Sequence, residues 1–550
     1  MKLDENSSLY KVRRRIDAKR RNKDLLAFER WREIGEIVIE DLKKRGQFFN
    51  TRQGLFFFDA ECRRAFPLYK DVDFAASINR RYGINPKEHG FERVLADLQT
   101  EAVLNGRKTE VRRFTHYDRK SKRLYVSRFD GYMYKLDGKS VAPVANGTDD
   151  VFFFDDHSLW EPYSYIEGTP KGQFDSQLIN SVNFVPSFLS VAEQRLFLKL
   201  WVLAVFFGNV QPTKIILLLL GEHGSGKTSA LRRIQKFIFG SKADLLSIEK
   251  DKPDGFVATV TADPLALFDN VDERISWLPY ALSRLATGVT FPRRQLYTTN
   301  NKLEFPGVSW LAITSRTVGF MENQPDLPDR TLVLNLGRLD DRQPEGELMN
   351  AVGERRNELW SELLDELNMI VRYLKRNPKP VAVQFRMADF ATFALKVAAL
   401  WGRRPEVKQA FEKLEEAQSD LAVSEEPIHL ILELWLENTT NYGRSVTAGT
   451  LYEEWAKLAR ASKTEWPYAN AKRLGQRLRQ LQFALRERFG VEVTWDAHSK
   501  QNQYRFWFKE PLAREQGAAA IPRSKWPVGV VSAPEGNPTA GFAGLLEGKS

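Results

Sequence analysis

An uninterrupted apolar run that leads into a glycine-rich loop constrains this chain more than any other feature. Residues 215–220 are all isoleucine or leucine, and residues 221–228 read Gly-Glu-His-Gly-Ser-Gly-Lys-Thr. Six consecutive apolar residues are typical of a parallel strand that is covered on both faces. The loop fits G-x-x-x-x-G-K-[ST] without mismatch, and a helical pattern follows it, which is the context that this phosphate-binding motif requires.

The chemistry of this loop predicts a nucleotide site. Its glycines let backbone N–H groups turn toward phosphate oxygens at the positive end of the following helix. The ammonium of Lys227 is expected to reach the β- and γ-phosphates, and the Thr228 hydroxyl to ligate Mg²⁺. The predicted nucleotide-binding residues are Gly221, Glu222, His223, Gly224, Ser225, Gly226, Lys227, Thr228 and Ser229.

Chain length and net charge limit the possible domain number and the possible partners. A chain of 550 residues is too long for one core, and its net charge of +11 favours an anionic partner, with nucleic acid as the first candidate and plain surface solubility as the alternative. A single cysteine, Cys62, and the absence of a leader pattern predict a cytoplasmic protein. No run is long and apolar enough to predict a membrane span, and the six scattered histidines do not predict a transition-metal site.

Two further strand patterns end in polar residues. Residues 264–268 are an apolar strand followed by Asp269, which we expect to hold the Mg²⁺ shell, because ligands bind at the carboxyl ends of parallel strands. A turn with surface acids is the alternative. Residues 309–316 form a third strand pattern that ends in Thr314, Ser315 and Arg316.

An arginine precedes a fourth apolar strand. Arg330 stands immediately before residues 331–336, where it could act as an arginine finger on a neighbouring subunit's nucleotide. Two alternatives remain open, namely Arg316 in that role, or a simple ion pair between Asp329 and Arg330.

The order of these parts resembles a known group. The loop, the Asp269 strand, the segment at 286–300, the Leu-Ala-Ile-Thr-Ser-Arg strand and the Pro-Asp-Arg turn are together similar to AAA+ ATPases of the superfamily 3 helicase type. The similarity is greatest to replication proteins of phages, plasmids and integrated elements, including the helicase half of viral primase-helicases. It covers roughly residues 209–339. It implies a hexameric ring that hydrolyses ATP with Mg²⁺ and moves on DNA, with Arg293, Arg294 and Lys302 on a loop or hairpin facing the pore.

The chain departs from that group at two positions. Members usually carry a second acid after the metal-binding aspartate, as the base that orients the attacking water, but this chain has Asn270 there. Asp272 or Glu273 must substitute, or hydrolysis is weak. The usual sensor asparagine on the third strand is also missing, so Thr314 or Ser315 must supply its hydrogen bond.

Pattern changes along the chain predict an α/β fold with several modules. A basic run at 11–23 indicates a solvated helix face or a contact to phosphate groups. The aromatic residues of the next module indicate a hydrophobic core or a surface that binds single-stranded nucleic acid. The predicted parts are a basic helical segment (1–45), an α+β accessory domain (46–160), connector helices (161–208), a P-loop AAA+ core with a parallel sheet (209–340), a helical subdomain (341–437), a winged-helix module (438–510) and a disordered tail (511–550).

The winged-helix prediction rests on residues 445–509, whose pattern is helix, helix, strand, polar turn and strand. Four leucines of the second helix fall on one face, opposite basic residues that could contact DNA. A solvated helix is the alternative. The predicted DNA contacts of this module are Lys472, Arg479, Arg486, Lys500 and Arg505.

These features give a leading hypothesis and two alternatives. The leading one is an ATP-dependent DNA helicase or translocase, acting as a ring oligomer on single-stranded or forked DNA during replication of a mobile element, with a primase partner left open. The alternatives are a nucleotide-switched DNA-binding or assembly protein with slow or no hydrolysis, which Asn270 favours, and a phage-defence NTPase. The predicted catalytic residues are Lys227, Asp269, Asp272, Glu273, Thr314 and Arg330.

Overall fold

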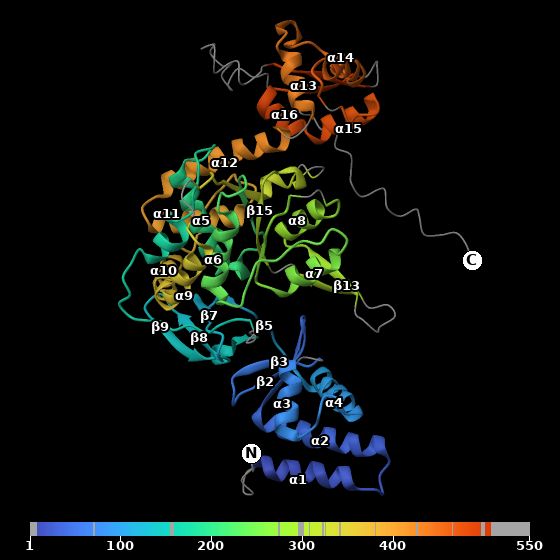
Figure 1. Ribbon diagram of the computed structural model, residues 1–550, viewed down its shortest axis with the longest axis vertical. Coiled ribbons are helices and arrows are strands. Elements are labelled where there is room, and N and C mark those ends of the chain that lie inside the picture. Colours follow the sequence, from blue (N-terminus) through green and yellow to red (C-terminus); the bar gives the residue numbers. More distant parts are fainter. Residues whose placement is uncertain are drawn as a thin grey trace, which may run out of the picture. The chain divides into compact units, whose positions relative to one another are not determined.

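The computed structural model describes two compact units, Met1–Glu426 and Pro427–Ser550, each treated by itself (Figure 1). The residues described are 8–69, 72–154, 159–272, 275–294, 302–306, 309–321, 324, 326–339, 343–379, 381–424, 427–464, 466–496 and 501–507. Among them, no helix is both long and apolar enough to cross a bilayer. The predicted tail at 511–550 lies outside the described residues.

The first unit begins with helices and a small sheet that share one core. The helices are α1 (Ser8–Arg21), α2 (Ala27–Arg45), α3 (Val72–Tyr82) and α4 (His89–Asn105), and the strands are β1 (Gly46–Thr51), β2 (Gly54–Asp59), β3 (Arg64–Pro67) and β4 (Arg107–Lys108), in the order β3-β2-β1-β4. Ile16 and Ile34 of the helices pack with Phe48 and Phe57 of the sheet. The predicted boundary at residue 45 therefore falls inside a continuous core.

The basic run of α1 binds groups of the same chain. Four of its cations reach acids or a carbonyl oxygen of α2, α3 and the segment before α4. The contacts are Arg13 Nε to the Arg81 carbonyl oxygen (2.9 Å), Arg15 to Glu40 (2.9 Å), Lys19 to Glu33 (2.5 Å) and Arg20 to Glu88 (3.0 Å). These contacts give the run a structural use without any phosphate.

A second small sheet packs in the same core as the central parallel sheet. It consists of β6 (Thr115–Asp118), β7 (Arg123–Ser127), β8 (Tyr132–Leu136) and β9 (Val141–Ala145), and β5 (Val111–Arg112) pairs with β10 (Phe152–Phe153) beside it. Phe114 and Val126 pack in the same cluster as Trp201 and Trp360. Buried side chains of the predicted accessory domain 46–160 thus belong to four hydrophobic clusters, two of which also contain residues from outside these bounds. Most of its phenylalanines are buried, which supports core packing over a nucleic-acid surface.

The central sheet has four parallel strands in the order β12-β15-β11-β16. These are β11 (Ile216–Leu220), β12 (Leu265–Phe268), β15 (Trp310–Ser315) and β16 (Thr331–Asn335). Every residue of β12 and β15 is buried, as a sheet covered on both faces requires. Helices α5 (Val191–Val205), η2 (Asp175–Asn180), α6 (Lys227–Phe239), α7 (Pro253–Ala262) and α8 (Leu278–Ala286) surround it, with the short turns η3 (Gly208–Val210) and η5 (Pro328–Arg330).

Two local features stand out in this region. Ser190 and Glu193 form a capping box at the start of α5, where the Ser190 hydroxyl accepts from the Glu193 N–H at 3.3 Å. A hairpin of β13 (Thr290–Arg294) and β14 (Lys302–Pro306) stands where a loop or hairpin was expected, with Arg294 opposite Lys302.

Helices complete the first unit after the sheet. They are α9 (Glu345–Glu354), α10 (Arg356–Arg376), α11 (Ala388–Leu400) and α12 (Arg404–Ser424). Buried Arg356 donates to the carbonyl oxygens of Phe237 and Ile238, each at 2.9 Å. It thereby satisfies carbonyl groups at the C-terminal end of α6, the helix that follows the glycine loop.

The second unit contains α13 (Pro427–Leu436), α14 (Ala448–Ala461), α15 (Ala471–Gln480) and α16 (Gln482–Phe489), with a sheet in the order β17-β19-β18. Its strands are β17 (Val446–Thr447), β18 (Glu492–Asp496) and β19 (Gln501–Arg505). It begins at Pro427, so α13 belongs to it although the prediction began the module at 438. The second helix of the predicted pattern is two helices, α15 and α16, because the backbone leaves the helical region at Leu481 (φ −91°, ψ 1°).

Candidate nucleotide-binding site

The glycine loop lies between β11 and α6, at the carboxyl edge of the parallel sheet. Gly224 and Gly226 have φ values of 76° and 81°, a conformation that favours glycine. At Gly221 a Cβ would lie 2.4 Å from the carbonyl oxygen of Leu336, so the loop passes too close to β16 for a side chain. These three positions explain why the motif needs its glycines in this chain.

Lys227 turns its ammonium back into the loop. Its Nζ donates to the carbonyl oxygens of Gly221 (2.5 Å) and Glu222 (2.8 Å). Burial lowers the pKa of Lys227, against the opposing field of the Asp272 and Asp269 carboxylates. The cation is therefore held inside the curve of the loop, which is where phosphate oxygens lie in a P-loop.

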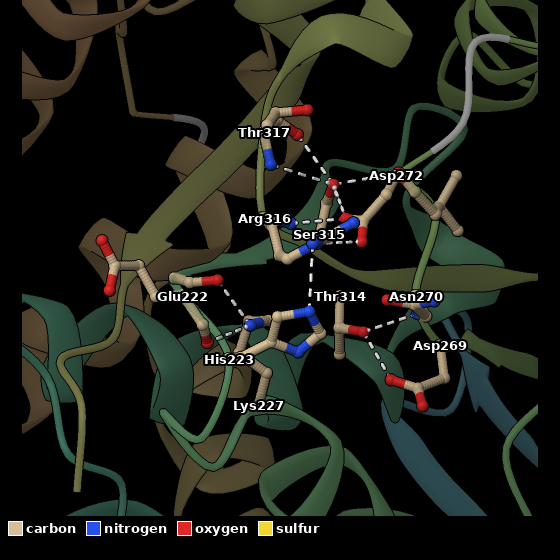
Figure 2. A network of polar contacts seen from close by, with 12 residues as sticks. Glu222, His223, Lys227, Asp269, Asn270, Asp272, Thr314, Ser315, Arg316 and Thr317 are labelled. Atoms are coloured by element: carbon tan, nitrogen blue, oxygen red, sulfur yellow. Dashed lines mark hydrogen bonds and ion pairs between the residues drawn. The ribbon is translucent and has the colours of Figure 1, made fainter.

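Three oxygen-bearing side chains meet beside the loop. Thr228 Oγ1, in the first turn of α6, donates to Asp269 Oδ1 at 2.9 Å, and Thr314 Oγ1 at the end of β15 donates to the same oxygen at 2.5 Å. The Asn270 N–H donates to Thr314 Oγ1 at 2.8 Å. Asp269 and Thr314 are far apart in sequence but converge because β12 and β15 are neighbours in the sheet (Figure 2). A hydroxyl and a carboxylate in contact are the oxygen donors that suit Mg²⁺.

Asn270 follows Asp269 in a left-handed conformation, with φ 56°. Asparagine and aspartate are the side chains that tolerate this conformation best. Asn270 lines a cavity of about 530 Å³ together with Asp269, Asp272 and Arg316. The residue at the expected base position therefore faces the same space as the predicted metal-binding aspartate.

Asp272 is one of the two candidates to replace the missing base, and it lies in the described part of the chain. Its carboxylate is bound by Arg316. Arg316 donates to it from Nε (2.5 Å to Oδ2) and from its backbone N–H (2.7 Å to Oδ1), and Ser315 Oγ lies 3.0 Å from Oδ1 (Figure 2). Burial would raise the pKa of Asp272, but the hydrogen bonds from Arg316 and Ser315 outweigh it and lower this pKa. Asp272 is thus a carboxylate with a lowered affinity for a proton. Glu273, the other candidate, lies outside the described residues.

Arg316 also links this group to the loop, since its Nη1 lies 3.0 Å from His223 Nε2. Sequence reasoning considered Arg316 only as an alternative finger and missed this bridge. The sequence signal that could have predicted this bridge was the position of Arg316 immediately after β15, the strand beside the one that carries Asp269. Arg232 was missed altogether, although it stands one helical turn after Thr228, lines the same cavity and pairs with Asp244 (2.9 Å).

Arg330 binds groups of its own chain. It pairs with Asp326 at 2.5 Å, and its Nη1 donates to the Ser283 carbonyl oxygen at 2.9 Å. Only 13% of its side chain is exposed. The alternative of an Asp329–Arg330 ion pair is not what the structure contains, because Asp329 pairs with Arg386 at 2.7 Å.

The predicted DNA-contacting residues divide into three groups. The backbones of Arg293, Arg294 and Lys302 lie in the β13–β14 hairpin, but their side chains are outside the described part of the structure. In the second unit, the leucines at 474, 478, 481 and 485 are buried while Lys472, Arg479 and Arg486 are exposed. Arg505 is half-buried on β19, and Lys500 lies outside the described residues.

A parallel sheet with a glycine-rich loop at its carboxyl edge defines an α/β protein with a P-loop. Residues 179–409 match the family described as the actinomycete integrative conjugative element replication protein. The match begins in η2, spans the whole central sheet and ends in α12. No curated protein matches the sequence.

Solved structures give weaker likenesses. A structure described as the A form apo structure of the NrS-1 C-terminal region is 12% identical, with 86% of this chain and 98% of that chain covered and a TM-score of 0.38. A small-molecule complex of JCV helicase is 15% identical, with 42% of this chain and 66% of that chain covered and a TM-score of 0.20. TM-scores of this size do not define a shared fold.

Proposed function

We propose that the chain is a replication protein of an integrated mobile element that binds and hydrolyses Mg-ATP at the glycine loop. The observation that carries this proposal is the 2.9 Å contact between Thr228 Oγ1 and Asp269 Oδ1, beside the Lys227 ammonium. The family match over residues 179–409 supports the replication role.

The residues have distinct tasks in this proposal. Lys227 exchanges its loop carbonyl partners for phosphate oxygens, and the loop N–H groups hold the same phosphates. Mg²⁺ held by Thr228 and Asp269 would neutralise charge on the β- and γ-phosphates. Thr314 fixes the Asp269 carboxylate through its 2.5 Å hydrogen bond, and so keeps one oxygen in place.

Motion along DNA, as a helicase or translocase, is the finer part of the proposal. It is supported by the β13–β14 hairpin, by the exposed cations of α15 and α16, and by the net charge of +11. The second unit has the helix and strand order expected of a winged helix, and we assign it to duplex or forked DNA.

A ring oligomer completes this proposal, with Arg330 as the finger that reaches a neighbouring subunit's nucleotide. This role requires Arg330 to leave Asp326, because the ion pair occupies its guanidinium within one chain. Opening of that pair on assembly would couple ring formation to catalysis.

A second candidate function is a nucleotide-driven assembly switch with slow hydrolysis. Two observations favour it, since Asn270 cannot accept the water's proton and Asp272 is bound by Arg316 at 2.5 Å. In this case nucleotide binding orders an oligomer on DNA, and turnover serves only to reset it.

Steady-state ATP turnover with and without single-stranded DNA separates the two candidates. A motor is expected to hydrolyse faster by several-fold when DNA is added, while a switch bound to DNA shows no stimulation. Measurable turnover that is identical in wild type and Lys227→Ala would contradict both, because each requires the glycine loop to hold the nucleotide.

A further inference from the structure

A cavity of about 710 Å³ lies at the opposite edge of the parallel sheet from the glycine loop. Its lining includes Lys214, just before β11, Pro264, just before β12, and Trp310, the first residue of β15. Parallel strands place all their amino ends at one edge, so this cavity and the glycine loop are separated by the length of the strands. Its volume falls in the range of roughly 300–1,000 Å³ that holds small-molecule ligands.

Lys214 supplies a buried cation to this cavity. Only 8% of the residue is exposed, and among the described residues none accepts a hydrogen bond from its Nζ. Asp389 is the acid whose charge acts on Lys214, and its Oδ2 already accepts from Thr213 Oγ1 (2.5 Å) and from the Thr213 N–H (3.0 Å). A lysine side chain that is largely removed from water is costly unless its ammonium is paired, and a bound anion would lower that cost.

Other residues that line the cavity add further donors and an aromatic ring. Arg113 stacks on Phe154, with its guanidinium carbon 4.8 Å from the ring centroid, and pairs loosely with Asp263 at 3.6 Å. His116 also lines the cavity, and burial together with the Arg112 charge lowers the pKa of His116 to about 4. At neutral pH its imidazole is therefore uncharged, and because its Nδ1 accepts from Asn209 Nδ2 at 3.3 Å, its Nε2–H is left as a donor.

Two more lining residues carry buried polar atoms without a partner in the described part of the chain. They are the indole Nε1–H of Trp310, a donor, and the side-chain oxygen Oε1 of Gln211, an acceptor. Both residues are almost fully buried, at 1% and 3% exposure. Unsatisfied buried donors and acceptors are rare in native proteins, and they are explained when a ligand completes them.

We propose that this cavity is a second ligand site, which binds one nucleotide unit by its phosphate and its base. Lys214 and Arg113 provide charge for the phosphate. The uncharged donor of Trp310 and the acceptor of Gln211, in a cavity that Phe154 also lines, suit a base, which has both kinds of group and a flat face, whereas a phosphate alone would use only donors.

The bound nucleotide unit could come from one of two chemical sources, a single-stranded DNA chain or a free nucleotide. Gly288, which also lines the cavity, stands two residues before β13, so a strand that follows the β13–β14 hairpin would pass nearby. The site does not depend on the proposed ATPase, because none of its residues belongs to the glycine loop.

Photocrosslinking of the full-length chain tests the proposal in two arms. One arm uses a thymidine oligonucleotide containing 4-thiothymidine, and the other uses 8-azido-ATP, with the labelled peptides identified by mass spectrometry. We expect label within residues 110–116 or 208–214 in at least one arm, in wild type and equally in Lys227→Ala. Label in the first arm alone assigns the site to DNA, label in the second alone assigns it to free nucleotide, and label in both supports the shared chemistry.

Lys214→Met is the decisive variant, and Lys408→Met, at a side chain 74% exposed on α12, is its matched control. Loss of one charge-assisted contact should reduce label at these peptides roughly tenfold in Lys214→Met and leave it unchanged in the control. Arg113→Gln provides a second variant if Lys214→Met lowers the melting temperature. Absence of label from these peptides in both arms, or equal label in wild type and in both cavity variants, would overturn the proposal.

Discussion

The two edges of the central sheet differ in how far their polar groups are hydrogen-bonded within the chain. At the carboxyl edge Thr228, Asp269 and Thr314 are joined by hydrogen bonds of 2.5–2.9 Å. At the amino edge Lys214 lacks a hydrogen-bonded acceptor among the described residues, and Trp310 and Gln211 carry unpartnered polar atoms. One edge is preorganised within the chain, while the other has polar groups that a ligand could complete.

This difference separates two kinds of site. Preorganised groups favour catalysis, because they need not rearrange as charge develops. Groups that gain partners only from a ligand favour binding, because an empty site bears the cost of their burial. We therefore expect substitutions at the carboxyl edge to change turnover, and substitutions at the amino edge to change binding and stability.

The largest expected effect is that of Lys227→Ala at the carboxyl edge. Loss of the phosphate-binding cation should reduce ATP turnover by about 100-fold or more, as removal of a preorganised charge-stabilising donor does elsewhere. Steady-state phosphate release measures it, with Lys236→Ala on the same helix as control. Cavity labelling should stay unchanged, and a parallel loss of both readouts would mean that the two edges are not independent.

Asn270→Asp should act in the opposite direction. The backbone at this position, with φ 56°, tolerates aspartate, and a carboxylate there could accept a proton from the attacking water. If a missing base limits hydrolysis, turnover rises by about tenfold or more. An unchanged rate in Asn270→Asp would indicate that another group already serves as the base, and Asp272→Asn or Glu273→Gln should then abolish turnover.

Thr314→Val should have a smaller effect at the same edge. The substitution keeps the shape but removes the hydroxyl that donates to Asp269 at 2.5 Å. One hydrogen bond to a charged group corresponds to roughly tenfold in rate. The matched control is Thr100→Val, whose exposed hydroxyl donates only to a carbonyl oxygen of its own helix. Equal rates in Thr314→Val and wild type would remove Thr314 from the catalytic group.

The smallest expected effect is a pH dependence of stability that comes from Lys214. Burial lowers the pKa of Lys214 from its ordinary 10.5 to about 8. Between these values the unfolded chain binds more protons than the folded one, so this group makes stability rise as the pH increases from 8 to 10.5. Denaturant unfolding across that range should show a steeper rise in wild type than in Lys214→Met. A parallel pH dependence in both proteins would contradict the burial of a charged lysine.

The carboxyl edge was largely predictable from the sequence, because a local motif encodes it. Residues 221–228 dictate strand, loop and helix by their order, and an apolar strand that ends in Asp269 has one place beside them in a parallel sheet. The contact between Asp272 and Arg316 was not predictable, since it depends on how two loops meet after neighbouring strands. The finger role given to Arg330 assumed a free side chain, whereas Asp326, four residues earlier, holds it.

The amino edge had no sequence signal. Its residues come from segments at 113–116, 211–214 and 310, and no motif relates Lys214 to Arg113 or Trp310. The packing of side chains across residue 45 had no sequence signal either. Charge patterns mark the basic helix α1, but only tertiary packing shows that Ile16 and Phe57 belong to one core.

Isothermal titration of a non-hydrolysable ATP analogue, with and without Mg²⁺, tests the central claim most directly. The Thr228–Asp269 contact predicts that wild type binds the analogue more tightly with Mg²⁺, that Asp269→Asn loses most of this dependence, and that Lys227→Ala binds poorly in either condition. Analogue binding that is equally tight in all three proteins, with no response to Mg²⁺, would contradict the assignment of the carboxyl edge as the Mg-ATP site.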